Sequence, residues 1–82
     1  MITVKFFGLI SVDNNIEKLT LNEGTISQVI NEVIRRYPSI GKEQLMQAVM
    51  FVNKKQITGN RRFSTVLKEG DELALLSPIS GG

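Results

Sequence analysis

Cysteine and histidine are both absent from this chain of 82 residues. Without cysteine the chain forms no disulfide and supplies no thiolate, which is typical of a cytoplasmic protein. Without histidine it lacks the commonest general base, the commonest metal ligand and the usual partner of a nucleophilic serine. Any chemistry must therefore use carboxylates, amines, hydroxyls or the chain end itself. We expect neither an ordinary enzyme active site nor a metal site.

Long apolar runs are missing too. No stretch approaches the roughly 20 apolar residues of a membrane span. The opening segment, Met1 to Lys5, lacks the basic region and the apolar run of a signal peptide. These absences predict a cytoplasmic protein with no membrane partner, and the length fits one domain with one core.

Positive charge is present but unevenly placed. Ten basic and eight acidic side chains give a net charge of +2, and residues 54–68 contain no acid. The basic residues of this segment are Lys54, Lys55, Arg61, Arg62 and Lys68. Such a patch can attract nucleic acid or an acidic protein. The modest net charge favours the alternative, a solvated loop and hairpin face, so nucleic acid is not expected as a partner.

The first predicted element is a strand over residues 2–7. Its apolar residues Ile2, Val4 and Phe6 share one face, with the period of two that a half-buried strand needs. Phe7 falls on the otherwise polar face. It is either the end of the core or an exposed apolar contact, and the core interpretation is slightly favoured.

A hairpin is predicted next. Residues 8–15 are rich in Gly, Ser, Asp and Asn, which indicates a turn or loop. A second strand follows at about residues 16–22, with Leu19 and Leu21 pointing inward. Two strands joined by a short loop most simply pair in the antiparallel sense.

The clearest element is a helix that begins after Thr25. Thr25 and Gln28 fit a capping box, in which each side chain accepts a hydrogen bond from the other residue's amide. The apolar residues that follow lie three and four apart, which predicts one buried stripe: Ile26, Val29, Ile30, Val33, Ile34 and Tyr37. Pro38 disfavours helical geometry at the preceding residue and ends the helix there.

Further strands complete the predicted sheet. Residues 42–47 are compatible with an extra helical turn, and residues 48–53 with an internal strand. A short extended piece is expected around Ile57, followed by a break at residues 59–60 and an extended stretch at residues 65–67. Gly70 lies in a turn where a positive φ is most easily adopted. Residues 72–77 are nearly all apolar and predict a central strand.

This order of elements predicts an α+β domain. Its mixed sheet has four to five strands, and one main helix crosses one face. The helix allows the first and last strands to pair in parallel through a right-handed crossover. The result is a ubiquitin-like β-grasp fold over residues 1–76, with residues 77–82 as an exposed Gly-Gly tail.

The tail has the chemistry of a reacting chain end. Glycine has no Cβ, so Gly81 and Gly82 can pass through a narrow cleft and adopt unusual dihedrals. Pro78 stiffens the tail and favours an extended Ser77, which reduces the entropy lost on insertion into a partner. Extended residues can also pair with the edge of a partner's sheet. The alternative is a frayed chain end.

At this point the chain resembles a known family. The matching parts are the Ile2-to-Gly8 opening, the Val52-Asn53 hairpin, the run Leu67 to Glu72 and the end Pro78-Ile79-Ser80-Gly81-Gly82. They are similar to the MoaD-type small subunit of molybdopterin synthase, of the ThiS/MoaD ubiquitin-like sulfur carriers. The succession of Gly-Asp-Glu, an apolar strand and Pro-x-Ser-Gly-Gly is the most specific part.

The resemblance implies a role for the chain end. A ubiquitin-activating-like adenylyltransferase would use ATP to adenylate Gly82, and a sulfur donor would then convert it to a thiocarboxylate. The tail, Pro78 to Gly81, would enter the large synthase subunit, which forms a heterotetramer with this chain and carries the catalytic residues. The sulfur would build the dithiolene that binds molybdenum or tungsten. The chain itself would be a non-catalytic subunit without a permanently bound cofactor.

Two features leave the partner open. Leu75 and Leu76 stand where the family often has aromatic residues, and Ser77 stands where proline is common. Phe7, Leu75 and Leu76 are candidates for an apolar partner surface, although ordinary strand burial is favoured for the leucines. Other hypotheses are a carrier for thiamine thiazole or cysteine synthesis, a ubiquitin-like modifier joined to proteins through Gly82, and a nucleic-acid-binding domain using residues 54–68.

Overall fold

The fold was obtained as a computed structural model, and the structure describes residues 1–77. The predicted tail residues Pro78, Ile79, Ser80, Gly81 and Gly82 lie outside the described residues. The elements in chain order are β1 (Ile2–Phe7), α1 (Leu9–Asn14), β2 (Lys18–Leu21), β3 (Gly24–Thr25), α2 (Ile26–Arg36), α3 (Lys42–Met46), β4 (Val49–Val52), β5 (Lys55–Ile57), the 3₁₀ helix η1 (Asn60–Ser64), β6 (Val66–Leu67) and β7 (Glu72–Leu76).

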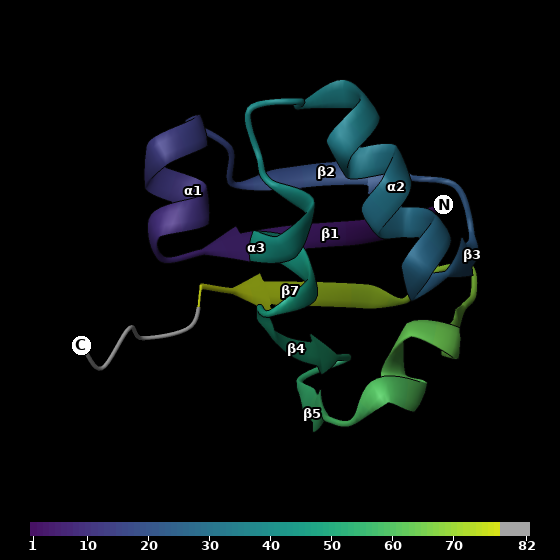
Figure 1. The fold of residues 1–82 in the computed structure, drawn as a ribbon. Coiled ribbons are helices and arrows are strands. Elements are labelled where there is room, and N and C mark those ends of the chain that lie inside the picture. Colours follow the sequence, from purple (N-terminus) through teal and green to yellow (C-terminus); the bar gives the residue numbers. More distant parts are fainter. Residues whose placement is uncertain (78–82) are drawn as a thin grey trace.

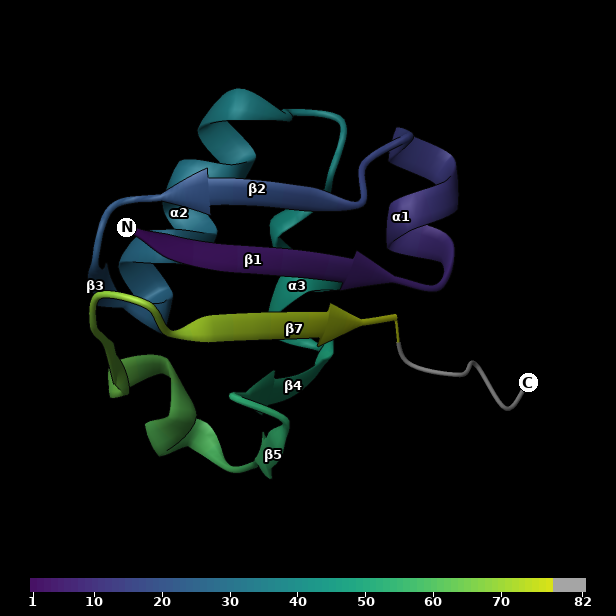
Figure 2. The same ribbon diagram turned by 180° about the vertical axis from the view of Figure 1, so that it is seen from behind.

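A mixed sheet of five strands forms the centre of the molecule. Its strand order is β2-β1-β7-β4-β5, and β3 and β6 form a separate two-stranded pair. The predicted β1–β2 hairpin is antiparallel, and β1 pairs in parallel with β7. Helices α2 and α3 lie across one face of the sheet, in front of it in Figure 1 and behind it in Figure 2. The predicted α+β β-grasp arrangement is therefore confirmed.

The core lies between α2 and the sheet. The predicted stripe of α2 is buried at Ile26, Val29, Ile30 and Val33, and the facing residues of the central strands are Ile2, Val4, Phe6, Leu73 and Leu75. The capping box forms as predicted: the Gln28 amide donates to Thr25 Oγ1 at 3.2 Å, and the Thr25 amide donates to Gln28 Oε1 at 2.9 Å. The helix ends at Arg36, before Pro38, as that proline requires.

Two segments differ from their predicted structure. Residues 9–14 form the short helix α1 and not a loop, while the 3₁₀ helix η1 replaces the predicted break at residues 59–60. Both are too short for an apolar stripe: α1 buries only Ile10, and no residue of η1 is buried. The α3 helix forms where one extra helical turn was considered. The β4–β5 hairpin is confirmed, with positive φ at Asn53 and Lys54 in its turn.

Three single-residue expectations need correction. Phe7 is 46% exposed, so the core interpretation is wrong and the side chain is accessible. Leu75 is fully buried and lies in the core, so it cannot belong to a partner surface. Ser77 was assigned to the exposed tail but is 9% exposed, and hydrogen bonds attach it to the body. The boundary between body and tail therefore falls after Ser77.

Candidate functional site

An apolar patch covers the face of the sheet that points away from α2. On β1, β7 and β4 the core residues alternate with side chains that point to this opposite face. The pairing of the strands places Phe7 opposite Leu76 and Leu76 opposite Val49. Two residues along the strands, and so on the same face of the sheet, Phe51 lies opposite Ala74. We call these five residues the open-face patch; Phe7 is exposed and the other four are half-buried.

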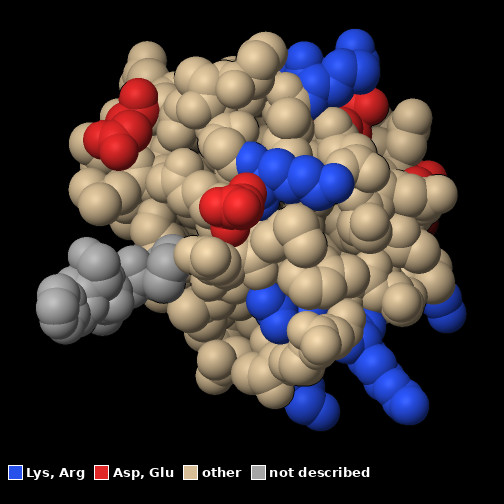
Figure 3. All heavy atoms as spheres, viewed as in Figure 1, with Lys and Arg blue, Asp and Glu red and all other residues tan. Residues whose placement is uncertain are grey.

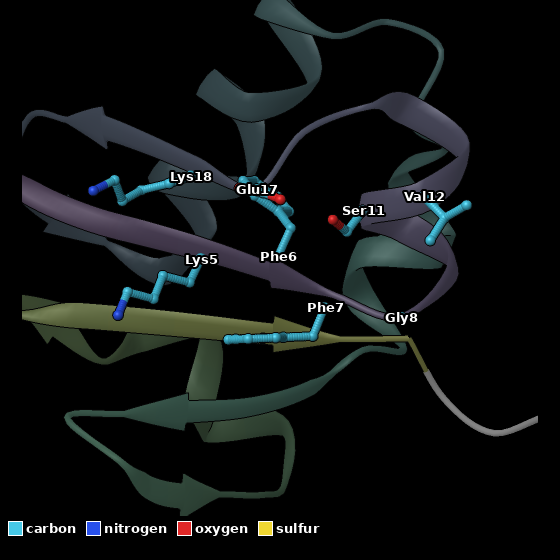
Figure 4. Close-up of a pocket in the computed structure, with 8 residues that line it drawn as sticks. All are labelled: Lys5, Phe6, Phe7, Gly8, Ser11, Val12, Glu17 and Lys18. Atoms are coloured by element: carbon cyan, nitrogen blue, oxygen red, sulfur yellow. The ribbon is translucent and has the colours of Figure 1, made fainter.

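Charged side chains border the patch on the β1–β2 side. Lys5 Nζ lies 3.0 Å from Glu72 Oε1 in an ion pair across β1 and β7. Figure 4 shows the Phe7 ring extending along β7, with Lys5 on the same strand as Phe7 and Lys18 on the neighbouring strand β2. A hollow of ≈ 480 Å³ lies beside β1, the start of β2 and α1. Its lining residues are Lys5, Phe6, Phe7, Gly8, Ser11, Val12, Glu17 and Lys18. An apolar centre with a charged rim is the usual anatomy of a protein-binding surface.

The root of the tail adjoins this patch. The Ser77 amide donates to the Phe7 carbonyl oxygen at 3.3 Å, and Ser77 Oγ accepts from the Ile10 amide at 2.8 Å. Five residues follow Ser77 in the chain, and five extended residues span at most about 17 Å. Any group that reacts with the Gly82 carboxylate must therefore come within this distance of Ser77.

Several residues of this surface were missed by sequence reasoning. Residues 48–53 were read as an internal strand, so Val49 and Phe51 were not recognised as open-face residues. The exposed side chains of α1, Leu9 at 60% and Val12 at 75%, lie in a segment predicted to be a loop. The four residues of β4 are all apolar, so no local signal in the sequence separates its two faces. Of the predicted contact residues, the structure places Phe7 and Leu76 together and Leu75 on the other side of the sheet.

The basic segment 54–68 is a separate surface. Arg62 is engaged in local structure, because Nη1 donates to the Gly59 carbonyl at 2.8 Å and Nη2 to the Met46 carbonyl at 2.7 Å. Its guanidinium also stacks 4.5 Å from the centre of the Phe63 ring. Figure 3 shows lysines and arginines separated from one another along the lower edge of the helix face. This spacing agrees with a solvated surface, and Arg62 in particular stabilises η1.

Other kinds of site find no support within residues 1–77. This part of the chain holds no cluster of three acidic, histidine or cysteine side chains that could bind a metal ion. No helix among the described residues has the length and apolar character needed to cross a membrane. The features that stand out are the open-face patch and the tail root beside it.

The fold and this arrangement define a ubiquitin-like β-grasp protein in which Ser77, the last described residue, lies beside an apolar sheet face. The chain belongs to the ThiS family, whose model matches residues 4–82, and thus to the ThiS/MoaD ubiquitin-like sulfur carriers. No curated protein matches the sequence.

Solved structures show the same fold. The small archaeal modifier protein SAMP1 from Methanosarcina acetivorans matches with a TM-score of 0.82 and 21% identity, over 99% of this chain and 95% of that one. CysO from Mycobacterium tuberculosis matches with a TM-score of 0.77 and 19% identity, over 96% and 100% of the two chains. A chain in the complex of subunits 1 and 2 of the molybdopterin-converting factor from Helicobacter pylori 26695 matches with a TM-score of 0.67 and 25% identity, over 99% and 97%.

Proposed function

We propose that this chain is the sulfur-carrying small subunit of a molybdopterin synthase, and that Gly82 carries the sulfur. The observation that carries the proposal is the hydrogen bond between the Ser77 amide and the Phe7 carbonyl oxygen. It holds Ser77, the residue before the tail, beside the open-face patch, and this supports a single docking event that would hold the body and deliver the chain end. Membership of the ThiS family and the 25% identity to a protein of the Helicobacter pylori complex support this pathway.

The proposed chemistry uses the Gly82 carboxylate as a substrate of other proteins. In an activating enzyme, a carboxylate oxygen attacks the α-phosphorus of ATP and pyrophosphate leaves, which gives an acyl adenylate. A donor of sulfide-level sulfur then attacks the acyl carbon and AMP leaves with the oxygen, which gives a thiocarboxylate. In the large subunit the sulfur passes to the pterin precursor. The body supplies docking and a high effective concentration of the tail.

A second candidate is a protein modifier. SAMP1, a small archaeal modifier protein, has the higher TM-score of 0.82. In that case the activated Gly82 carbonyl would be attacked by a lysine amine of another protein and would form an isopeptide bond. A carrier for cysteine synthesis is a third, related candidate, because CysO shares the fold. All three use the same activated chain end and differ in the nucleophile that follows.

Intact-mass analysis separates these candidates. The full chain is incubated with ATP, sulfide and the adenylyltransferase of the same organism, and then with the large subunit and the pterin precursor. We expect a mass change equal to one oxygen replaced by sulfur, which reverts when the precursor is converted. Isopeptide adducts in cell extracts without any thiocarboxylate would instead establish the modifier. A thiocarboxylate that only a thiazole or cysteine synthase consumes would overturn the molybdopterin assignment.

A further inference from the structure

Ser77 is the one polar residue that the described part of the chain buries, and it lies at the root of the tail. It sits directly after β7, so its position determines where the remaining residues leave the body. We propose that Ser77 is a positioning residue for the reaction at Gly82: it fixes the point and the direction from which the tail enters a partner. This inference rests on the proposed role of Gly82.

The first contact that fixes Ser77 is made by its side chain. The Ile10 amide donates to Ser77 Oγ at 2.8 Å, and the bond is buried. Ile10 is the second residue of α1, and Gly8 at the N-cap has no side chain that could accept from this amide. A capping hydroxyl normally belongs to the residue directly before its helix and accepts from the second or third amide. Here Ser77 performs this function from 67 residues away.

The second contact is made by its backbone. The Ser77 amide donates to the Phe7 carbonyl oxygen at 3.3 Å, which extends the parallel β1–β7 ladder by one residue beyond Leu76. Ser77 is therefore held through both its backbone amide and its side chain, which reach Phe7 at the end of β1 and Ile10 in α1. Its hydroxyl also donates to the Phe7 carbonyl oxygen at 3.5 Å. A single bond would permit rotation about its axis, whereas two bonds fix both position and orientation.

Gly8 makes the close approach possible. Its φ is +76°, and a Cβ added there would lie 3.2 Å from Ser77 Cβ and 3.3 Å from Ser77 Oγ. That φ is rarely adopted by residues with a side chain. The β1–α1 connection therefore provides a space that Ser77 occupies. The helix α1 that Ser77 caps also exposes Leu9 and Val12.

The reaction at Gly82 depends on this anchor because the tail is short. With five residues after Ser77, a change in the direction of the root moves the carboxylate relative to the nucleotide of the activating enzyme. A misplacement of about 1 Å can lower a rate about 100-fold. Docking of the body uses other residues, so loss of the anchor should lower kcat for adenylation and leave KM for the carrier nearly unchanged.

The test compares full-length variants with the adenylyltransferase of the same organism. The first pair is wild type and Ser77→Ala; the second is Ser77→Thr and Ser77→Val, which have nearly the same volume and differ in the hydroxyl. Ser64→Ala, at an exposed serine of η1, is the matched control. We expect Ser77→Ala and Ser77→Val to lower kcat for ATP–pyrophosphate exchange about tenfold or more with KM within about twofold, and Ser77→Thr to restore kcat.

Amide hydrogen exchange provides a readout that does not depend on activity. The Ile10 amide should exchange faster in Ser77→Ala and Ser77→Val than in wild type and Ser77→Thr. Equal kcat for all variants with an active wild-type chain would overturn the inference and leave the proposed function intact. Unchanged exchange at Ile10 would also overturn it. A wild-type chain that is never adenylated would overturn the proposed function and this inference together.

Discussion

Asp71 is a residue that joins two turns at the end of the sheet far from the tail. Its Oδ2 accepts from the Lys68 amide at 2.8 Å, and its Oδ1 accepts from Asn53 Nδ2 at 3.1 Å. Asn53 in turn accepts from the Glu72 amide at 2.9 Å. The hydrogen bond from the Lys68 amide, and then that from Asn53, hold the pKa of Asp71 below its ordinary value of 3.8. The ionised Asp71 carboxylate therefore stabilises the folded state.

This lowered pKa predicts how stability depends on pH. Because the folded-state pKa lies below the unfolded one, the contribution of Asp71 is complete above pH 3.8 and is lost as the pH falls through the lowered pKa. Asp71→Asn should therefore be less stable than wild type near neutral pH, and the difference should shrink in acid. Urea unfolding at a series of pH values measures it, with Asp13→Asn on exposed α1 as the control. A difference that stays constant with pH would contradict this assignment.

Phe7 gives a second prediction at the residue scale. Its side chain is 46% exposed in the open-face patch, so Phe7→Ser should change the free energy of unfolding little. It should weaken binding of the large synthase subunit markedly, because aromatic residues near the centre of an interface often contribute about 2 kcal/mol or more. Titration calorimetry with the large subunit measures this effect. Val66→Ser, at a residue 57% exposed on β6, is the matched control and should bind like wild type.

At the scale of elements, α2 depends on both its cap and its buried face. Thr25→Ala removes the hydroxyl that accepts from the Gln28 amide. We expect a loss of about 0.5–2 kcal/mol in the free energy of unfolding, the usual contribution of an N-cap. Urea unfolding followed by circular dichroism measures this loss. Ser27→Ala, at an exposed position two residues after Thr25, should have a smaller effect. Equal losses in the two variants would argue against the capping box.

The buried face of α2 should contribute more than its cap. Ile30 is 2% exposed and lies in the core. Ile30→Ala should lower the free energy of unfolding by about 2–5 kcal/mol, since it removes apolar contacts and leaves a cavity. The comparison is Ile34→Ala on the half-buried edge of the same helix, where a smaller loss is expected. A similar loss at both positions would mean that Ile34 is buried as deeply as Ile30, which would contradict the buried face described above.

The elements also show which features a sequence can reveal. The cap and stripe of α2, the end of that helix before Pro38 and the alternation in β1 are local patterns, and they predicted these elements correctly. Helix α1 could not be predicted in this way. Its cap comes from Ser77, 67 residues away, and its apolar residues Leu9 and Val12 face outward. A six-residue helix with one buried side chain has no periodic pattern to recognise.

The candidate site was predicted only in part, because it too depends on contacts between residues that are distant in the sequence. The polar side of β1 identified Phe7 as unusual, but only the sheet order shows that its neighbours across the strands are Leu76 and Val49. Alternation alone leaves the two faces of β7 ambiguous, because its residues 73–76 are all apolar. Leu75 was therefore named for a partner surface although it faces the core. The position of Ser77 depends on the β1–α1 connection and has no local signature.

At the scale of the whole molecule, the body and the chain end should be separable. The core and the sheet lie within residues 1–77, so deletion of Gly82 should leave the melting temperature nearly unchanged. The same deletion should abolish adenylation and sulfur transfer, because it moves the terminal carboxylate back by one residue. Differential scanning calorimetry and the pyrophosphate-exchange assay measure the two effects. A large fall in melting temperature would contradict the separation of body and tail.

The central position of β7 has a consequence for the synthesis of the protein. Among residues 1–77, β7 is the last strand, yet it lies between β1 and β4, and its parallel partner β1 is the first strand. On the ribosome, the sheet cannot close until residue 76 has left the exit tunnel, because its middle strand is still missing. Contacts between such distant segments also form slowly. A chain truncated by a damaged message before β7 therefore exposes an incomplete core, which leaves it open to cellular proteases.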